Sequence, residues 1–353
     1  MKKIPFVPLC LIVLFVAPNL PAKDQVSHEI ADTLLLYQRA NGGWPKNFEW
    51  EDELNDKQKK ELLSQKQKTD TTIDNGGTFR EVRHLSQAYL KFKDQRYRKA
   101  ALKGIAFLLE AQYDNGGWPQ YYPVAKGYSR HITFNDNAMV GAMSLFRDIV
   151  QGEPEYGFVD DTMRQQAAQA IDKGIDCILT CQIVVNGKKT AWCAQHDEKT
   201  LEPRMARSYE LASLSGAESV KIVRFLMAIE NPTSEVIEAI EAAVAWFDQV
   251  KIVGKRIQRI QDASKPGGRD RIVVQDPSAP TLWARFYEIR TNRPFFCSRD
   301  GIPKYRLSEI SHERRNGYSW MGGYADSLLN KDYPAWQKQH NSIQTDQGNY
   351  LKK

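Results

Sequence analysis

The sequence QRANGGWP at residues 38–45 recurs as QYDNGGWP at residues 112–119, 74 positions further along the chain. A degenerate third copy begins at Gln182, after another 70 residues. Each copy follows a segment with apolar residues at helical spacing, and Asn-Gly-Gly favours the left-handed backbone that ends a helix. A repeat of this length indicates one structural unit used three times.

Each repeat contains segments of amphipathic helical pattern. Helices are predicted over residues 29–37, 79–92, 98–112, 138–150 and 163–181, whereas only residues 183–185 and 272–274 have a strand pattern. Three helix pairs arranged in a ring would make an all-α fold, an (α/α)3 barrel or toroid with long functional loops and little strand. We interpret the repeat tryptophans as packing between helix ends, with sugar binding as the alternative.

The amino-acid composition is typical of a globular protein. The chain has 353 residues, of which 42% are hydrophobic, so it can bury a large core. No linker rich in Gly, Ser or Pro divides it, and we expect residues 23–353 to form a single domain, acting as a monomer. A net formal charge of +6 fits an anionic partner without requiring one. The basic runs are typical of solvated helix faces, so no nucleic-acid partner is predicted.

Residues 1–22 have the pattern of a signal peptide. Two lysines precede an apolar run that is too short to span a bilayer, and Leu20-Pro21-Ala22 is an acceptable cleavage site. The mature protein is therefore expected to be secreted or periplasmic, without a membrane anchor.

The predicted mature chain has four cysteines, Cys177, Cys181, Cys193 and Cys297. One or two disulfides could form in an oxidising compartment, and the sequence leaves their pairing open. Cys177 and Cys181 have helical spacing, but they lack the partners that a zinc site needs.

The stretch WCAQHDEKTLEPRMARSYELASLSGAES at residues 192–219 has neither helical nor strand periodicity. A loop of this length inside a compact domain is either functional or disordered, and its aromatic and apolar residues argue against disorder. The loop carries His196, Arg204, Arg207 and Tyr209 as candidate functional residues, although a structural loop held by its own hydrogen bonds is the plainer interpretation.

Two acid–amide pairs precede predicted helices. Asp74 and Asn75 lie before the helix at 79–92, and Asp136 and Asn137 lie before the helix at 138–150. Such residues often serve as helix N-caps. The repeat, however, would place both pairs at one end of the toroid, where they could form the oxygen-rich site that calcium prefers.

Several ordered blocks give the chain a resemblance to the pectate lyases of polysaccharide lyase family 10, from about residue 29 to residue 324. They are NGGWPKN, TIDNGGTFREV, NGGWPQYYP, ITFNDNAM, WCAQHD, ARSYELASLSG, LWARFYEI and FCSRDG. The resemblance implies an (α/α)3 toroid in an exported enzyme. It also implies Ca2+-dependent cleavage of α-1,4-polygalacturonate (pectate) by β-elimination, which gives 4,5-unsaturated oligogalacturonates.

The resemblance also implies roles for individual residues. It makes Arg207 the catalytic base, with Arg204 as the alternative, and it implies that Ca2+ is bound by Asp74, Asn75 and Asp136. The substrate-binding residues that we expect are Arg285, Arg299, Arg204, His196 and Tyr209.

An arginine base is chemically demanding. A free guanidinium has a pKa above about 12, so Arg207 could accept a proton only if calcium and nearby cations disfavour its charged form. A clamp for a substrate carboxylate is the alternative role for Arg207. His196, with an ordinary pKa near about 6.5, is the competing base.

Three other functions stay open at this point. A polygalacturonate hydrolase would use two carboxylates and no calcium. A non-catalytic protein that binds acidic polysaccharides would use Trp and Tyr platforms. A terpenoid-cyclase-like toroid would need a DxDD or DDxxD motif, which the chain lacks beyond Asp160-Asp161.

Overall fold

The computed structural model of the chain describes residues 26–51 and 53–340. The signal peptide predicted at residues 1–22 lies outside these residues. Helices account for most of the regular structure: α1 His28–Tyr37, α2 Asp56–Ser64, α3 Phe79–Phe92, α4 Gln95–Glu110, α5 Ala138–Gln151, α6 Asp161–Cys181, α7 Glu218–Met227, α8 Ser234–Gln249 and α9 His312–Gly317. None of the helices within the described ranges is long and apolar enough to cross a membrane.

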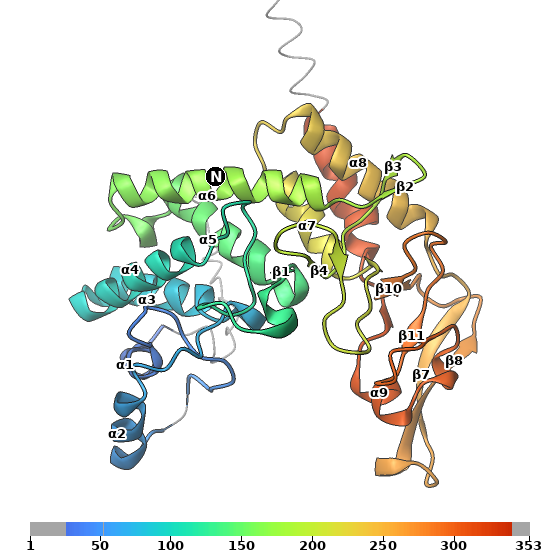
Figure 1. Cartoon of the computed structure of the whole chain (residues 1–353), viewed down its shortest axis with the longest axis horizontal. Helices are drawn as coiled ribbons and strands as arrows, with labels where there is room; N and C mark the ends of the chain where they lie inside the picture. Colours follow the sequence, from blue (N-terminus) through green and yellow to red (C-terminus); the bar gives the residue numbers. More distant parts are fainter. Residues whose placement is uncertain (1–25, 52, 341–353) are drawn as a thin grey trace, which may run out of the picture.

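Three helical hairpins form the body of the molecule (Figure 1). They are α3–α4, α5–α6 and α7–α8, one for each repeat. The first helix of each hairpin packs on the first helix of the next, in the order α3, α5, α7. The second helices pack in the same way, in the order α4, α6, α8. Helix α1 packs on the first hairpin. The five predicted helices are confirmed, and the fold is all-α of the α/α toroid class.

The repeat glutamines tie the hairpins together. Each Nε2 donates a hydrogen bond of 2.9 Å to a backbone carbonyl in the second helix of the hairpin that follows it. The pairs are Gln38–Ala100, Gln112–Ala170 and Gln182–Ala239. Because the three bonds are equivalent, the degenerate third copy is confirmed as a structural repeat.

The repeat tryptophans are packing residues. All three are fully buried. Each indole Nε1 donates to a carbonyl of the helix before it, in the pairs Trp44–Leu34, Trp118–Leu108 and Trp192–Ile178, at 2.7–2.8 Å. The interpretation as packing at helix ends is therefore confirmed, and these rings are not accessible to a sugar.

The end of the first repeat helix differs from the prediction. Helix α1 ends at Tyr37, and Gln38 after it has an extended ψ of 129°, so no left-handed cap is formed. The positive φ falls instead on Gly42, at 95°, in the turn that follows. A Cβ atom there would lie 2.3 Å from the Lys103 carbonyl oxygen, so close approach to α4 requires the glycine.

Most of the strands have only two residues. The strands are β1 Ile132–Thr133, β2 Val184–Val185, β3 Lys188–Lys189, β4 Gln195–His196, β5 Pro203–Arg204, β6 Leu214–Ser215, β7 Lys255–Gln261, β8 Arg269–Gln275, β9 Trp283–Ala284, β10 Phe286–Tyr287, β11 Phe296–Cys297, β12 Pro303–Lys304 and β13 Met321–Gly322. The β7–β8 hairpin is the longest pair, and it projects away from the helices at the lower right of Figure 1. The two segments with a predicted strand pattern overlap β2 and β8. The four cysteines within the described residues, Cys177, Cys181, Cys193 and Cys297, are buried free thiols.

Candidate active site

Three carboxylates gather at one end of the helical hairpins. Asp74 lies in the 3-10 turn η2 (Asp74–Gly76) before α3, and Asp136 lies in the turn η4 (Asn135–Asn137) before α5. Glu218 is the first residue of α7. The two turns contact each other, so the acids from successive repeats meet as the sequence predicts.

The two aspartates do not act as helix caps. Thr78 precedes α3 and Asn137 precedes α5, and neither helix has a side-chain hydrogen bond at its N-terminus. Asn75 and Asp136 have left-handed backbones instead, with φ of 52° and 50°. Non-glycine residues adopt this conformation at a cost, and such strain is concentrated at functional sites.

Asp74 has one free carboxylate oxygen. Its side chain is 2% exposed, and Oδ2 forms an ion pair with Lys46. Oδ1 is buried and has no hydrogen-bond partner among the described residues. Burial lowers the pKa of Lys46, but the hydrogen bond and charge of Asp74 outweigh it and raise that pKa overall. An unsatisfied buried carboxylate oxygen is costly, so this position favours a cationic ligand.

Asp136 is held among like charges. Burial raises the pKa of its carboxyl group, and the negative charges of Asp74 and Glu218 raise it further, against the opposing effects of Arg285 and Arg207. The net effect disfavours the charged form of this carboxyl group, and a bound cation would favour it. The neighbouring Asn75 is exposed, and its side chain forms no hydrogen bond within the part of the chain that the structure describes. Oxygens of Asp74, Asp136 and Asn75 are therefore the donors that could hold a hard divalent cation.

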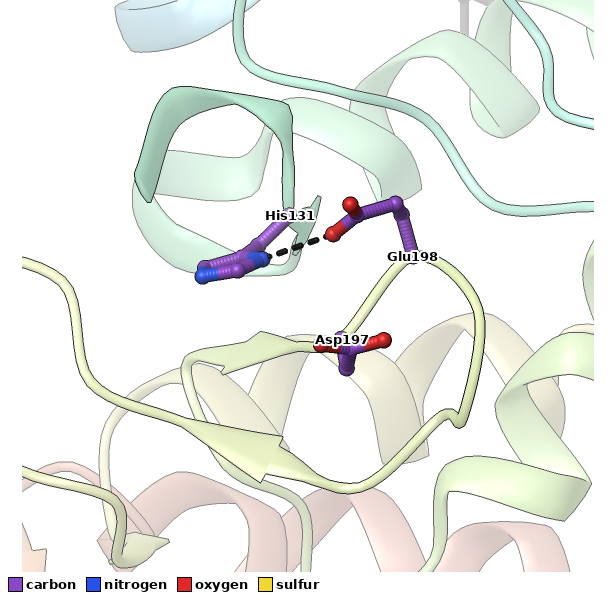
Figure 2. A group of neighbouring side chains, drawn as sticks. All are labelled: His131, Asp197 and Glu198. Carbon is purple, nitrogen blue, oxygen red and sulfur yellow. Dashed lines mark hydrogen bonds and ion pairs between the residues drawn. The ribbon is translucent and has the colours of Figure 1, made fainter. Parts of the chain in front are cut away.

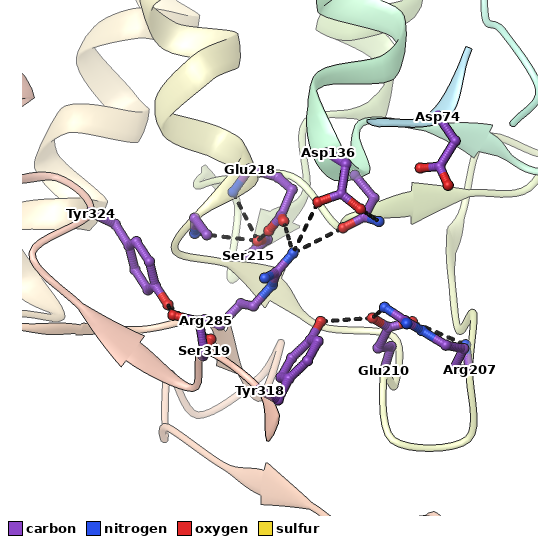
Figure 3. Close-up of polar contacts among 12 residues, drawn as sticks. Asp74, Asp136, Arg207, Glu210, Ser215, Glu218, Arg285, Tyr318, Ser319 and Tyr324 are labelled. Atoms are coloured by element: carbon purple, nitrogen blue, oxygen red, sulfur yellow. Dashed lines mark hydrogen bonds and ion pairs between the residues drawn. The ribbon is translucent and has the colours of Figure 1, made fainter. Parts of the chain in front are cut away.

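Arg285 lies between the carboxylates, as Figure 3 shows. Its Nη2 donates to Glu218 and, at 3.0 Å, to Asn135 Oδ1, and it lies 4.0 Å from Asp136 Oδ1. The guanidinium stacks 4.8 Å from the centre of the Tyr318 ring. Burial lowers the pKa of Arg285, yet Glu218 and its neighbours raise it overall, so this side chain stays a fixed cation.

Arg207 is clamped by Glu210. Its Nε donates to Glu210 Oε2 at 2.7 Å, and its Nη2 donates to Oε1 of the same carboxylate. The buried Glu210 also accepts the Tyr318 hydroxyl at 2.6 Å. The hydrogen bonds to Glu210 are the main reason why the pKa of Arg207 is raised. In this arrangement Arg207 is a cation, and it can accept a proton only after the pair with Glu210 is loosened.

Three guanidinium groups surround Tyr209. Those of Arg314, Arg207 and Arg299 lie 4.5, 5.0 and 5.6 Å from the ring centre. Tyr209 is buried, whereas the side chain of Arg299 is 64% exposed and pairs with Glu313 at 3.0 Å. The cluster presents positive charge beside Arg207, which suits carboxylate recognition.

The structure places Arg204 and His196 differently from each other. Arg204 is half-exposed and donates to Asp197 Oδ2 at 2.9 Å. His196 is fully buried, with Nδ1 2.8 Å from the Leu201 carbonyl and Nε2 accepting the Cys193 amide at 3.1 Å. Burial lowers the pKa of His196 to about 4. Both ring nitrogens are engaged, so in this conformation His196 supports the loop and does not face solvent.

A second group of potential ligands consists of His131, Asp197 and Glu198 (Figure 2). One ligand atom from each lies within 4.8 Å of the others. Both carboxylates already have cationic partners, because Arg204 pairs with Asp197 and Arg130 pairs with Glu198 at 3.0 Å. The two carboxylates of this group are therefore already paired with cations, unlike Oδ1 of Asp74, which has no partner among the described residues.

A cavity of about 270 Å³ opens at the carboxylates, lined in part by Asp136, Glu218, Arg285 and Tyr324. A larger hollow of about 890 Å³ lies between the β2–β3 hairpin and α8, and none of the predicted site residues lines it. The charged residues of the candidate site and the larger hollow are thus in different parts of the molecule.

Five residues of the site were not singled out from the sequence: Lys46, Glu210, Glu218, Arg314 and Tyr318. The repeat could have indicated Glu218, because this residue begins the first helix of the third hairpin. Asp74 and Asp136 precede the first helices of the other two hairpins in a similar way. Lys46 directly follows the first repeat motif. The partners of Arg207 depend on how the long loop folds, which periodicity does not predict.

Comparison with known proteins identifies the family. The family model described as Pectic acid lyase matches residues 38–329. A solved structure of a family 10 polysaccharide lyase from Cellvibrio cellulosa is 36% identical, with a TM-score of 0.76 over 87% of this chain and 92% of that one. An aspartate-to-alanine mutant of a family 10 lyase from the same organism, in complex with trigalacturonic acid, is 37% identical, with a TM-score of 0.74 over 85% and 90%. No curated protein matches.

The family match covers most of the chain, and the solved relatives are similar to it in both sequence and fold. The functions left open by the sequence, a hydrolase, a binding protein and a terpenoid-cyclase-like toroid, are not those of the family. This chain therefore belongs to polysaccharide lyase family 10 and is a pectate lyase.

Proposed function

We propose that this lyase cleaves α-1,4-polygalacturonate by calcium-dependent β-elimination, with Arg207 as the base and 4,5-unsaturated oligogalacturonates as products. The observation that carries the proposal is geometric: Arg285 Nη2 donates to Glu218 and lies 4.0 Å from Asp136 Oδ1, and the charges of Asp74 and Arg207 also act on Asp136. The acids that we propose for the cation and the arginines that we propose for the substrate carboxylates are therefore neighbours. The complex of the Cellvibrio enzyme with trigalacturonic acid supports the substrate class.

Asp74 and Asp136 would bind the calcium ion together with Asn75. The unpartnered buried Oδ1 of Asp74 and the mutual repulsion of the acids fit a hard cation. Two carboxylates supply fewer than the about six to eight oxygens that calcium takes, so the uronate carboxylate and water would complete the set. When bound, the ion would draw negative charge onto the substrate carboxylate and so acidify the adjacent C5 proton.

Arg207 would remove that proton. The electrons of the C5–H bond become the C4–C5 double bond, the bond from C4 to the glycosidic oxygen breaks, and the leaving oxygen takes a proton from solvent. Arg207 must be neutral to act, and Glu210 opposes this by holding the guanidinium charged. Alkaline pH and release from Glu210 would increase the neutral fraction.

Fixed arginines would hold the substrate. The guanidinium of Arg285 lies 4.8 Å from the centre of the Tyr318 ring, and that of Arg299 lies 5.6 Å from the centre of the Tyr209 ring. Bidentate contact with uronate carboxylates is the geometry that Arg supplies and Lys does not. Arg204, in the same loop as Arg207, would supply a further cation for the substrate. Tyr209 would support the arginines through its ring, and the buried His196 would hold the loop in place. We further propose that the enzyme is exported and acts as a monomer.

Matched variants test the choice of base. Arg207→Lys is expected to lower kcat by about a thousandfold, about 4 kcal/mol in the barrier, while KM stays near the wild-type value. Arg204→Lys, the matched control on the same loop, should keep most of the activity. The wild-type rate should climb through pH 9 without levelling, whereas a histidine base would level near about pH 7.5. A strong loss in Arg204→Lys with a mild one in Arg207→Lys would reassign the base.

A further inference from the structure

The β7–β8 hairpin carries an unusual concentration of positive charge. Residues 255–275 contain six basic and two acidic residues, against a net formal charge of +6 for the entire chain. Both acids are occupied: Asp262 bonds to Ser264 in the hairpin turn, and Asp270 forms a buried pair with Arg315 at 2.6 Å. Neither acid forms an ion pair with a basic side chain of the hairpin.

The antiparallel register divides these residues between two faces. Lys255 pairs with Gln275, Arg259 with Arg271, and Gln261 with Arg269. Side chains alternate along a strand, so the basic residues on one face are Lys255, Arg259, Arg269 and Arg271. That face, which we call the arginine face, has no carboxylate. Arg256 lies on the opposite face and is paired with Asp276.

Arg259 and Arg271 are directly opposite each other. Like charges in this position destabilise a hairpin, so local folding does not account for the pair. The side chains of Lys255, Arg259 and Arg269 form no hydrogen bond or ion pair with any residue in the described ranges. A row of unpaired cations that costs stability favours an anionic ligand with repeated charges.

The arginine face is connected to the catalytic site. Arg271 donates to the backbone carbonyls of Tyr318 and Asn316 at 2.9 and 3.3 Å, and Tyr318 is the residue on which Arg285 stacks. Burial raises the pKa of Tyr324, and Arg285 and Arg271 both oppose that rise. Tyr324, which lines the cavity, is therefore close enough to both arginines to be affected by their charges.

We propose that the arginine face of the β7–β8 hairpin is an additional binding site for uronate carboxylates of the polygalacturonate chain whose other residues occupy the catalytic site. This rests on the proposed substrate. The hairpin would favour long chains over short ones, because each further uronate carboxylate that contacts the arginine face adds to binding.

Chain-length kinetics test the proposal with a matched pair of variants. Arg259→Ala and Arg256→Ala each remove one exposed arginine from the same strand, but from opposite faces. Arg259→Ala is expected to raise the ratio of KM for polygalacturonate to KM for trigalacturonate about threefold to tenfold, where tenfold corresponds to about 1.4 kcal/mol. Arg256→Ala should leave that ratio at the wild-type value. Arg269→Ala, on the arginine face, provides a second test.

Thermal unfolding separates binding from structure. Arg259→Ala removes a like-charge pair, so its Tm should equal or exceed that of the wild type while its KM ratio rises. An unchanged ratio in both Arg259→Ala and Arg269→Ala, or an equal rise in Arg256→Ala, would overturn the proposal. Wild-type cleavage of trigalacturonate, measured in the same series, reports on the proposed function independently of the hairpin.

Discussion

Replacing Glu210 with glutamine should make the enzyme faster at a given alkaline pH. The carboxylate is the largest contributor that raises the pKa of Arg207, and it does so through direct hydrogen bonds. Glutamine keeps the shape of the side chain and removes its charge. The pKa of Arg207 should then fall, and a larger fraction of the guanidinium would be neutral at any pH below that pKa.

The size of the effect follows from the geometry. Two unit charges about 4 Å apart attract by about 4 kcal/mol at the effective dielectric constant of a protein surface. The side chain of Arg207 is 43% exposed, so solvent screening reduces this energy. We expect about 1.4 kcal/mol, or one pKa unit, to remain, which corresponds to about tenfold more neutral Arg207.

The assay is kcat/KM on trigalacturonate from pH 8 to about pH 11, at fixed calcium. The profile of Glu210→Gln should lie up to about tenfold above the wild-type profile. Tyr318→Phe is the control, because it removes only the neutral hydrogen bond to Glu210 and should give no gain. A loss of tenfold or more at every pH in Glu210→Gln would refute the argument, because it would show that Arg207 works as a cation positioned by Glu210.

Three further predictions concern calcium, substrate binding and stability. Asp136→Ala should abolish activity at low calcium, with partial recovery in excess calcium; full activity at low calcium would remove this residue from the metal site. Arg299→Lys should raise KM for polygalacturonate about tenfold and leave kcat nearly unchanged, since lysine cannot copy a bidentate contact; an unchanged KM would exclude a clamp. Asp270→Asn should lower the free energy of unfolding by about 3 kcal/mol at pH 7, because it breaks the buried pair with Arg315. That pair lowers the pKa of Asp270, so its stabilisation is complete above the unfolded pKa of about 3.9 and is lost as the pH falls below it. The difference from wild type in urea unfolding should therefore shrink toward pH 2, and a constant difference would contradict the assignment.

The helical framework was predictable because its determinants are local. Apolar spacing predicted α3 with the bounds that the structure has, and the repeat predicted the equivalence of Gln38, Gln112 and Gln182. The same repeat explains why Asp74 and Asp136 were expected to meet. They lie at equivalent points of successive units, so any ring of such units brings them together.

The electrostatic state of the site was not predictable in the same way. The pKa of Arg207 is raised by Glu210, three residues away, and by Tyr318, more than one hundred residues away. The burial of His196 results from a loop fold that no periodicity encodes. Contacts of this kind depend on the path of irregular backbone, which has weak local determinants.

The most direct test of calcium-dependent elimination follows the products on polygalacturonate with and without a chelator. Elimination leaves a C4–C5 double bond that absorbs in the ultraviolet, whereas hydrolysis produces new reducing ends without it. We predict that ultraviolet absorbance rises in step with new reducing ends, stops after exhaustive chelation and returns when calcium is restored. Reducing ends that form without the absorbance, or an elimination rate that survives chelation, would contradict the proposed mechanism.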